Sequence, residues 1–490
     1  MANGSARIGW AALLIALVLA SPVLALDPQR AIAQYKHTRW TVEDGAPGAI
    51  EDIAQTPDGY LWLGTPLGLY RFDGVTFEPV RPPRPKTYNL GDRVVRMMVT
   101  RSGALWVGYE DGGLAVIEKG KIRLLFDPAI FHSVVYSLAE GQDGAIWATT
   151  SNPKAKVVRF VNGAWQILDP LIDMPGEAHW VFVARNGAVW VAGSGRVARM
   201  RPGEPRFTTI QSGFVEEVAL AEDRRGSIWA GDAQGVRIVE GPGAGQVVYP
   251  LPSVSRQTRI FFDRDDSLWG ARHPDGVFRM RLTPSPGNAM PDIDQFSAAQ
   301  GLSSEMVYRA FEDREGDIWV GTVRGLDRFR PAAIVPENAV PISSPYGYGV
   351  FADAQGAVYV YDTETLYKAN PGQPLKPLIR RLGPFTTMCD APGGGIWMGL
   401  GSEVLRVDGD RVTRLPDPPF PNVQVTACAM DARGNLWGAG FMGGLVKWDG
   451  RKWTHAMPEA LGRAVTALLA DSRGRIVADG GRNAVLIDGG

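Results

Sequence analysis

The chain has 490 residues, with 51 basic and 52 acidic side chains and a formal net charge of −1. This balance gives no excess of positive charge that would favour a nucleic-acid backbone or an anionic membrane surface. The 59 glycines and 36 prolines fit a folded chain made of many short strands and turns. We therefore expect a globular, strand-rich protein that has no nucleic-acid partner.

The first 25 residues read as a targeting segment. An apolar run from Ile8 to Ala20 follows a short stretch with one arginine, and small residues lead to Val23-Leu24-Ala25, before Leu26. The run is too short for a comfortable membrane span, so it predicts a secretory signal peptide over residues 1–25. The alternative is an uncleaved signal anchor. Both readings predict export.

The rest of the chain repeats one unit about every forty residues. Its cleanest copy, Asp313–Arg330 (DREGDIWVGTVRGLDRFR), has an Asp-x-x-Gly turn, an apolar residue and Trp, Gly-Thr, and a second short run. Aligning all copies on the tryptophan gives eleven positions: Trp62, Trp106, Trp147, Trp190, Trp229, Trp269, Trp319, Tyr359, Trp397, Trp437 and Val477. A period of this length with several short strands per unit predicts an all-β fold of the β-propeller class.

Within the cleanest copy we expect three strands, at Val307–Glu312, Asp317–Thr322 and Gly325–Phe329. Aspartate can bond its own backbone in the turn between the first two, and glycine supplies the positive φ that the turn needs. Residues before the next copy supply a fourth strand. One such sheet cannot bury both faces alone, so it must stack on its neighbours, with tryptophans between the blades.

Copies one to seven predict one closed seven-bladed propeller of four-stranded antiparallel blades over residues 26–335, although six or eight blades stay open. The segment Gln34–Gly45 has strand character and aligns with Phe296–Gly301, so the N-terminal strand would complete the last blade. The Pro-bounded stretch Pro331–Pro336 then reads as a linker. Residues 336–490 hold four further repeats, which we expect to form a partial second propeller, as in an incomplete gene product. The alternative is a small four-bladed ring.

The two cysteines, Cys389 and Cys428, fall in the predicted first strands of adjacent copies, but at different offsets within the repeat. A disulfide is one reading in an oxidising compartment. Strands that splay apart seldom meet the required distance, however, so we expect two buried thiols. Two cysteines at this spacing predict no metal site.

The segments Trp40–Gly74 and Gly301–Arg330 resemble two-component regulator propeller repeats. Those repeats form the periplasmic sensor portion of membrane histidine kinases, hybrid two-component systems and some diguanylate cyclases. Two seven-bladed propellers, a β-sandwich module, a transmembrane helix and a cytoplasmic transmitter are usual there. This sequence has no second apolar span, phosphoacceptor-helix pattern or nucleotide-binding glycine box. The resemblance therefore implies a periplasmic ligand-sensing module without its transmitter, with membrane anchoring as the alternative.

The resemblance also implies partners: a small molecule or glycan fragment as ligand, a second copy in a homodimer, and a membrane transmitter domain or partner. The alternative function is an exported interaction or scaffold propeller. A propeller lyase or a quinoprotein is the enzyme alternative, because fold alone does not decide function.

No residue pattern predicts catalysis or a cofactor. The five histidines are never in metal-ligand spacing, and no Gly-x-Ser-x-Gly elbow occurs. The acidic residues of the repeat turns are expected to be structural: Asp58, Asp143, Asp223, Asp313 and Asp431. We therefore predict that the chain is not an enzyme and needs no cofactor or metal.

A candidate binding site follows from the register of the first strands, which line the channel of a propeller. Ten residues before each repeat tryptophan, the first seven copies carry Asp52, Arg96, Ser137, Trp180, Ala219, Arg259 and Arg309. If the ring closes, Arg259, Arg309, Asp52 and Arg96 lie on four consecutive blades, with Glu51 and Tyr308 one residue earlier. Guanidinium groups bind carboxylates or acidic sugars in a bidentate manner, and a tyrosine can stack on a sugar. The alternative is that Asp52 and Glu51 merely pair with the neighbouring arginines.

Overall fold

The structure is a computed structural model in which the chain divides into two compact units, Met1–Val335 (unit 1) and Pro336–Gly490 (unit 2). It describes residues 26–488, except 29, 84–90, 128–129, 132, 155, 169–176, 194, 251–256, 283–291, 333–339, 341–346, 372, 384, 402, 419–424, 441–443, 457–460, 462–464 and 481–482. The predicted signal peptide lies outside the described residues. Strands dominate both units, and the all-β propeller class predicted from the repeats is confirmed.

In unit 1, seven four-stranded antiparallel sheets are described, which we number as blades 1–7. Blade 1 contains β2 (Asp52–Gln55), β3 (Leu61–Thr65), β4 (Gly68–Phe72) and β5 (Phe77–Val80); blade 2 contains β6 (Val94–Val99), β7 (Leu105–Tyr109), β8 (Leu114–Glu118) and β9 (Lys121–Leu125). Blade 3 contains β10 (Val135–Glu140), β11 (Ile146–Thr150), β12 (Val157–Val161) and β13 (Ala164–Ile167); blade 4 contains β14 (Trp180–Val183), β15 (Val189–Gly193), β16 (Arg196–Met200) and β17 (Thr208–Ser212). Blade 5 contains β18 (Ala219–Glu222), β19 (Ile228–Asp232), β20 (Gly235–Glu240) and β21 (Val247–Pro250); blade 6 contains β22 (Gln257–Phe262), β23 (Ser267–His273), β24 (Gly276–Arg281) and β25 (Asp292–Phe296).

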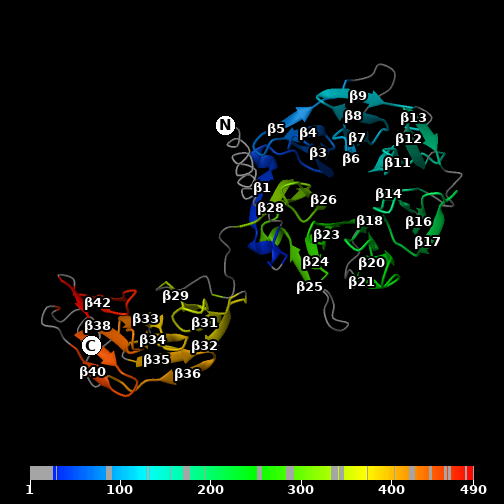
Figure 1. The fold of residues 1–490 in the computed structure, drawn as a ribbon. Helices are drawn as coiled ribbons and strands as arrows, with labels where there is room; N and C mark the ends of the chain where they lie inside the picture. The colour runs from blue at the N-terminus through cyan, green and yellow to red at the C-terminus, as the bar shows by residue number, and fades with distance from the viewer. Residues whose placement is uncertain are drawn as a thin grey trace, which may run out of the picture. The chain divides into compact units, whose positions relative to one another are not determined.

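Blade 7 is built from both ends of unit 1. It contains β26 (Val307–Glu312), β27 (Ile318–Thr322) and β28 (Gly325–Arg330), and β1 (Lys36–Thr41) adds the fourth strand. Strand β1 pairs antiparallel with β28, from Lys36 opposite Arg330 to Thr41 opposite Gly325. The predicted completion of the last blade by the N-terminal strand is therefore confirmed. Figure 1 shows the blades of unit 1 around a common centre, with first strands such as β6, β14 and β18 on the inside.

In unit 2, blades 8–11 follow the same plan. Blade 8 contains β29 (Gly349–Ala352), β30 (Val358–Tyr361), β31 (Leu366–Ala369) and β32 (Lys376–Ile379); blade 9 contains β33 (Phe385–Asp390), β34 (Ile396–Leu400), β35 (Glu403–Asp408) and β36 (Arg411–Arg414). Blade 10 contains β37 (Ala427–Met430), β38 (Leu436–Gly440), β39 (Gly444–Trp448) and β40 (Trp453–His455); blade 11 contains β41 (Ala467–Ala470), β42 (Ile476–Asp479) and β43 (Ala484–Ile487).

Helices are short where the chain is described. Three 3-10 turns are seen: η1 (Ile32–Gln34), η2 (Val42–Asp44) and η4 (Ala298–Gln300). Over the described part of the chain, none of the helices has the length and apolar character needed to cross a membrane.

In several repeats, an aspartate six residues before the repeat tryptophan fixes the first hairpin and holds the tryptophan. In blade 7, one carboxylate oxygen of Asp313 accepts the backbone N–H of Asp317 at 2.8 Å. The other accepts the indole N–H of Trp319 at 2.7 Å. Three other pairs of turn aspartate and repeat tryptophan repeat this arrangement: Asp223 with Trp229, Asp263 with Trp269, and Asp431 with Trp437. The expected structural role is thus confirmed for Asp223, Asp313 and Asp431.

The repeat tryptophans also reveal how consecutive blades pack. Trp319 of blade 7 is buried against Ile53, Leu61 and Leu63 of blade 1. In the same way, Trp147 packs on residues either side of the next tryptophan in the chain. Each blade therefore places its tryptophan face against the opposite face of the following blade. In unit 1 this pattern runs through all seven blades and back to the first, so the ring is closed by the same apolar contact throughout.

The expectation of two buried thiols is wrong, because Cys389 in β33 and Cys428 in β37 form a disulfide. Their Cα atoms are 5.8 Å apart, within the range that a disulfide spans. Cys389 lies opposite Trp397 and so on the tryptophan face of blade 9. Cys428 lies opposite Gly438 and so on the other face of blade 10. Because side chains alternate along a strand and these two faces meet, the differing offsets point the sulfurs toward each other.

Consecutive hairpins of unit 1 are joined by a contact that we call the hairpin latch. It links the residue five positions before one repeat tryptophan to the residue seven positions before the next. In the latch from blade 6 to blade 7, Arg264 donates its backbone N–H and its Nε to Glu312, at 2.9 and 2.6 Å. Its Nη2 donates to the carbonyl oxygen of Asp313 at 2.7 Å. Two further latches pair an arginine with a glutamate in the same way: Arg101 with Glu140, and Arg185 with Glu222.

Candidate functional site

The predicted charged cluster assembles at the centre of unit 1 around Asp52. This carboxylate is fully buried at the start of β2 and accepts the backbone N–H of Met97 at 2.7 Å. Its oxygens lie 3.1 Å from Nε of Arg309 and 3.8 Å from Nη1 of Arg96. Blades 7, 1 and 2 thus meet through one acid and two guanidinium groups.

Arg259 and Arg96 extend the cluster to the other side of the centre. Arg259 of β22 donates Nη1 to the backbone carbonyl of Glu51 in blade 1, at 3.2 Å. Arg96 donates Nε to the carbonyl of Tyr136 at 2.7 Å, and its guanidinium lies 5.1 Å from the ring centroid of Trp180. Burial, followed by repulsion from Arg259, lowers the pKa of Arg96 to about 9. The charges of Asp52 and Glu217 act in the opposite direction on the pKa of Arg96.

Glu51 and Tyr308 occupy a different position from the three central arginines. Glu51 is engaged by Arg93, whose Nη2 donates to Oε1 at 2.8 Å. The hydrogen bonds that Arg93 donates to Glu51 raise the pKa of Arg93, with smaller contributions from the charges of Glu51, Glu110 and Tyr308. The alternative reading, in which the two acids pair with arginines across blades, is thus part of the geometry: Glu51 is paired with Arg93, and Asp52 is shared between Arg96 and Arg309.

Several residues of this region do not figure in the predicted site. Tyr136 donates its hydroxyl to Glu177 at 2.9 Å, and His179 lies 3.1 Å from the same carboxylate. Burial, then that hydrogen bond, raises the pKa of Tyr136 to about 12. Tyr136 occupies the repeat position of Tyr308 and Glu51, eleven residues before the tryptophan, so the same register could have found it.

A cavity of about 560 Å³ lies beside the cluster, on the hairpin side of blades 4 to 7. Aromatic side chains of two first strands, β14 and β22, line it, together with Arg309. These aromatic residues are Trp180, Phe182, Phe261 and Phe262. Arg309 is thus the cluster residue that also faces the cavity, and its side chain keeps 23% exposure. Hairpin residues of both charges also line the cavity, among them the acids Glu222, Asp263 and Asp266. Where its aromatic surface meets the Arg309 guanidinium, the cavity suits a ring-bearing molecule with a carboxylate.

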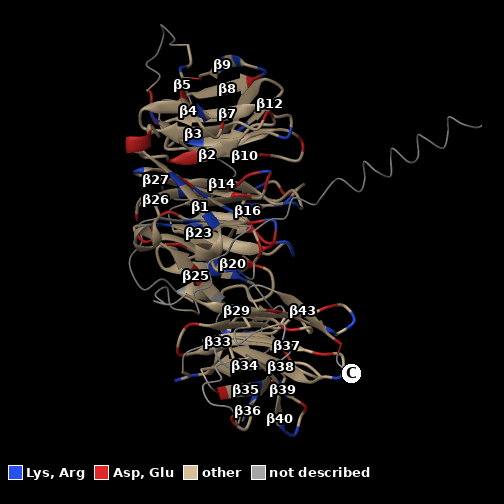
Figure 2. Ribbon diagram, turned by 90° about the vertical axis from the view of Figure 1, so that its left-hand side faces the viewer, with Lys and Arg blue, Asp and Glu red and all other residues tan. Residues whose placement is uncertain are grey.

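Charges elsewhere are distributed without a dominant sign. Figure 2 shows basic and acidic residues of both signs in each unit, in this view mostly at turns and strand ends. Where residues are described, no group of three or more His, Cys, Asp or Glu side chains is arranged to hold a metal ion. The channel cluster is therefore the concentration of charge that we consider as a site.

The closed ring of four-stranded sheets, with a tryptophan at each blade contact, defines unit 1 as a β-propeller built from sequence repeats. Residues 301–324 match the family described as two component regulator propeller. This match confirms the resemblance predicted from the repeats. A search of curated proteins finds no match.

Solved structures with this fold include extracellular domains of signalling systems from B. thetaiotaomicron. One, described as a hybrid two component system, is 15% identical with a TM-score of 0.57, covering 93% of this chain and 73% of that chain. Another, described as a one component system, is 15% identical with a TM-score of 0.50, covering 91% of this chain and 64% of that one. The chain thus spans about two thirds of the length of these structures. At this identity the likeness concerns the fold alone.

A streptogramin B lyase is also similar, at 14% identity and a TM-score of 0.49, covering 62% of this chain and 99% of that chain. This likeness is too distant to indicate an activity.

Proposed function

We propose that the chain is a periplasmic ligand-sensing propeller module of a two-component-type signalling protein. Its ligand is a small anionic molecule, such as an acidic sugar or glycan fragment, bound at the centre of unit 1. Arg96 and Arg309 pair with the buried carboxylate of Asp52, and Arg259 interacts with it electrostatically. Glu217 and the buried Glu51 are further acids of this region. The convergence of three guanidinium groups at the centre of unit 1 is the observation that carries the proposal, because a bound carboxylate would pair with them.

Arg309 is the residue that best connects ligand and scaffold. It contacts Asp52 in the next blade and lines the aromatic cavity. A carboxylate bound there would compete with Asp52 for the guanidinium. This competition would weaken the ion pair that joins blades 7 and 1. A signal of this kind would pass to a transmitter domain or partner, with a homodimer as the assembly. The proposal assigns no catalysis to the chain.

The test is calorimetric titration of the full chain with D-galacturonate, and with neutral D-galactose as the comparison. We expect saturable binding of the acid only, and about tenfold or greater weakening in Arg309→Ala. The matched control is Arg324→Ala, because Arg324 is an exposed arginine of the same blade that pairs with Glu43. An unchanged affinity in Arg309→Ala would contradict the proposed site.

A further inference from the structure

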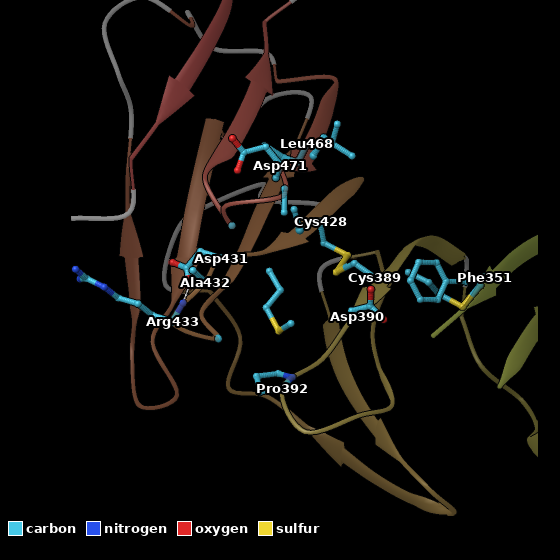
Figure 3. Close-up of a pocket in the computed structure, with 17 residues that line it drawn as sticks. Phe351, Cys389, Asp390, Pro392, Cys428, Asp431, Ala432, Arg433, Leu468 and Asp471 are labelled. Atoms are coloured by element: carbon cyan, nitrogen blue, oxygen red, sulfur yellow. Dashed lines mark hydrogen bonds between the residues drawn. A yellow bond between two sulfur atoms is a disulfide. The ribbon is translucent and has the colours of Figure 1, made fainter. Parts of the chain in front are cut away.

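Unit 2 contains a second cavity, of about 780 Å³, at the hairpin ends of the first strands of blades 8 to 11. It occupies the place within unit 2 that the aromatic cavity occupies in unit 1. Its wall includes Phe351, Met388, Met430 and Leu468, together with the Cys389–Cys428 disulfide (Figure 3). Thioether, disulfide and aromatic groups form an adaptable apolar surface.

The apolar character of this wall arises because unit 2 lacks the arginine latches. At the latch positions, where unit 1 carries pairs such as Arg264 and Glu312, blades 9 to 11 carry small or apolar residues, apart from Asp390 and Ser472. The small or apolar residues all line the cavity and are Pro392, Met430, Ala432 and Ala470. Removing long charged side chains from consecutive hairpins leaves open space and an apolar lining.

One latch acid remains, and it has lost its cation. Asp390 stands seven residues before Trp397, and the partner position in blade 8 is Ala354. Ala354 donates its backbone N–H to Oδ1 of Asp390 at 3.0 Å but has no guanidinium to offer. Within the described part of the chain, Asp390 has no ion pair, whereas Glu312 has Arg264 at 2.6 Å.

Figure 3 shows how this carboxylate is presented. Asp390 lies beside the Phe351 ring and the disulfide, at the wall of the cavity. Arg433 also lines the cavity, but its side chain extends away from Asp390. The Asp390 carboxylate therefore faces a cavity whose lining is partly apolar and partly polar, and Asp431 and Asp471 also line it. The nearby Arg433 supplies no counter-charge there.

We propose that this cavity binds a small organic ammonium compound with an apolar body. The ammonium group pairs with Asp390 and lies against the face of Phe351, while the apolar body contacts Met388, Met430 and Leu468. Carboxylate pairing and cation–π attraction both strengthen in a partly desolvated site. The preference is opposite in charge to that of the unit 1 cluster, and this inference does not depend on the proposed function of that cluster.

The direct test is calorimetric titration of the full chain with 2-phenylethylammonium, 2-phenylethanol and 3-phenylpropionate. These probes share an aromatic body and differ in charge. We expect saturable binding of the ammonium compound, about tenfold or more weaker binding of the alcohol, and none of the carboxylate in unit 2. Absence of saturable ammonium binding at millimolar concentration, or equal affinity for the alcohol, would overturn the proposal.

Two variants locate the site. Asp390→Asn keeps an acceptor for the Ala354 N–H but removes the charge, so it should weaken ammonium binding about tenfold or more. Ala354→Arg restores the missing latch cation and should abolish ammonium binding while the protein stays folded by circular dichroism. Asp408→Asn, at an acid 64% exposed on β35, is the matched control. Retained binding in both Asp390→Asn and Ala354→Arg would refute the assignment, and Arg309→Ala should leave ammonium binding unchanged.

Discussion

In first hairpins that carry a turn aspartate, the residue two positions before the repeat tryptophan either stabilises or repels the negative charge of that carboxylate. In blade 10 this residue is Asn435, whose amide donates to both oxygens of Asp431, at 3.1 and 2.9 Å. In blade 7 it is Asp317, which repels Asp313 and has a long ion pair with Arg328, 3.9 Å. Burial first, and then the charge of Asp313, raises the pKa of Asp317 from 3.8 to about 6.

This raised pKa predicts a pH-dependent stability of unit 1. Because the unfolded chain releases the Asp317 proton at lower pH than the folded chain, the free energy of unfolding falls as pH rises from about 4 to 6. Asp317→Asn should flatten that part of the profile and raise the free energy of unfolding at pH 7 by about 1–2 kcal/mol. Urea titrations across this range measure it, with the exposed Asp410→Asn as control. An unchanged profile would contradict the argument.

Some of these residue roles could be predicted from the sequence, and others could not. The turn aspartates follow from local chemistry, since each bonds groups within six residues of itself. The absence of a hydrogen-bond acceptor for some of the tryptophans is harder to predict from the sequence. Ala184 and Ala391 replace the turn aspartate in blades 4 and 9, and the indole nitrogens of Trp190 and Trp397 are then buried without a hydrogen bond in the described structure. A repeat alignment shows the substitution, but only packing shows that nothing else reaches the indole.

At the scale of elements, the hairpin latch links sheets that share no backbone hydrogen bonds. Its two ends belong to different copies of the repeat, and its spacing becomes visible only when position −5 of one copy is compared with position −7 of the next. For that reason the latches of Arg264 and Arg185 are not apparent from one copy alone. The channel cluster was easier to predict, because Asp52, Arg96 and Arg309 share one position on strands whose alternation fixes where side chains point.

The latch from blade 6 to blade 7 predicts a measurable contribution to stability. Arg264→Ala removes charge-assisted bonds to Glu312 and a bond to a backbone carbonyl, and Glu312 is left partly buried without its cation. We expect a loss of about 1–2 kcal/mol in the free energy of unfolding of unit 1. Arg225→Ala, at an exposed turn position of blade 5, serves as control. If both variants unfold at the same denaturant concentration, the latch does not stabilise the ring.

For the whole molecule, the two units have separate cores and different means of joining blades. Unit 1 uses the closed ring and arginine latches, and unit 2 has the disulfide between blades 9 and 10. The repeat period predicted the sheets well, because each copy carries its own turn and strand signals. The cysteine pairing could not be judged from distance along the repeat. It required knowing on which face of its blade each cysteine, Cys389 and Cys428, lies, and which faces of blades 9 and 10 meet.

The disulfide predicts selective destabilisation of unit 2. The double variant Cys389→Ser/Cys428→Ser removes a cross-link that closes a loop of 39 residues. We expect a decrease of about 2–4 kcal/mol in the free energy of unfolding of that unit. Differential scanning calorimetry should show a lowered transition for unit 2 and an unchanged one for unit 1, and dithiothreitol should act likewise on the native chain. A shift of both transitions together would contradict independent units.

The pairing of β1 with β28 also determines the order in which unit 1 can fold. Lys36 and Arg330 are paired although about 290 residues separate them, and closing so long a loop is entropically slow compared with forming hairpins. During synthesis, β1 stays unpaired until the whole of unit 1 has been made. Until then, the edge of β28 has no partner strand. The stacking of Trp40 on Trp319, whose ring centroids are 5.7 Å apart in the folded ring, is also absent. Before β1 docks, the unpaired edge of β28 is open to aggregation or to a chaperone. The docking of β1 ends this exposure.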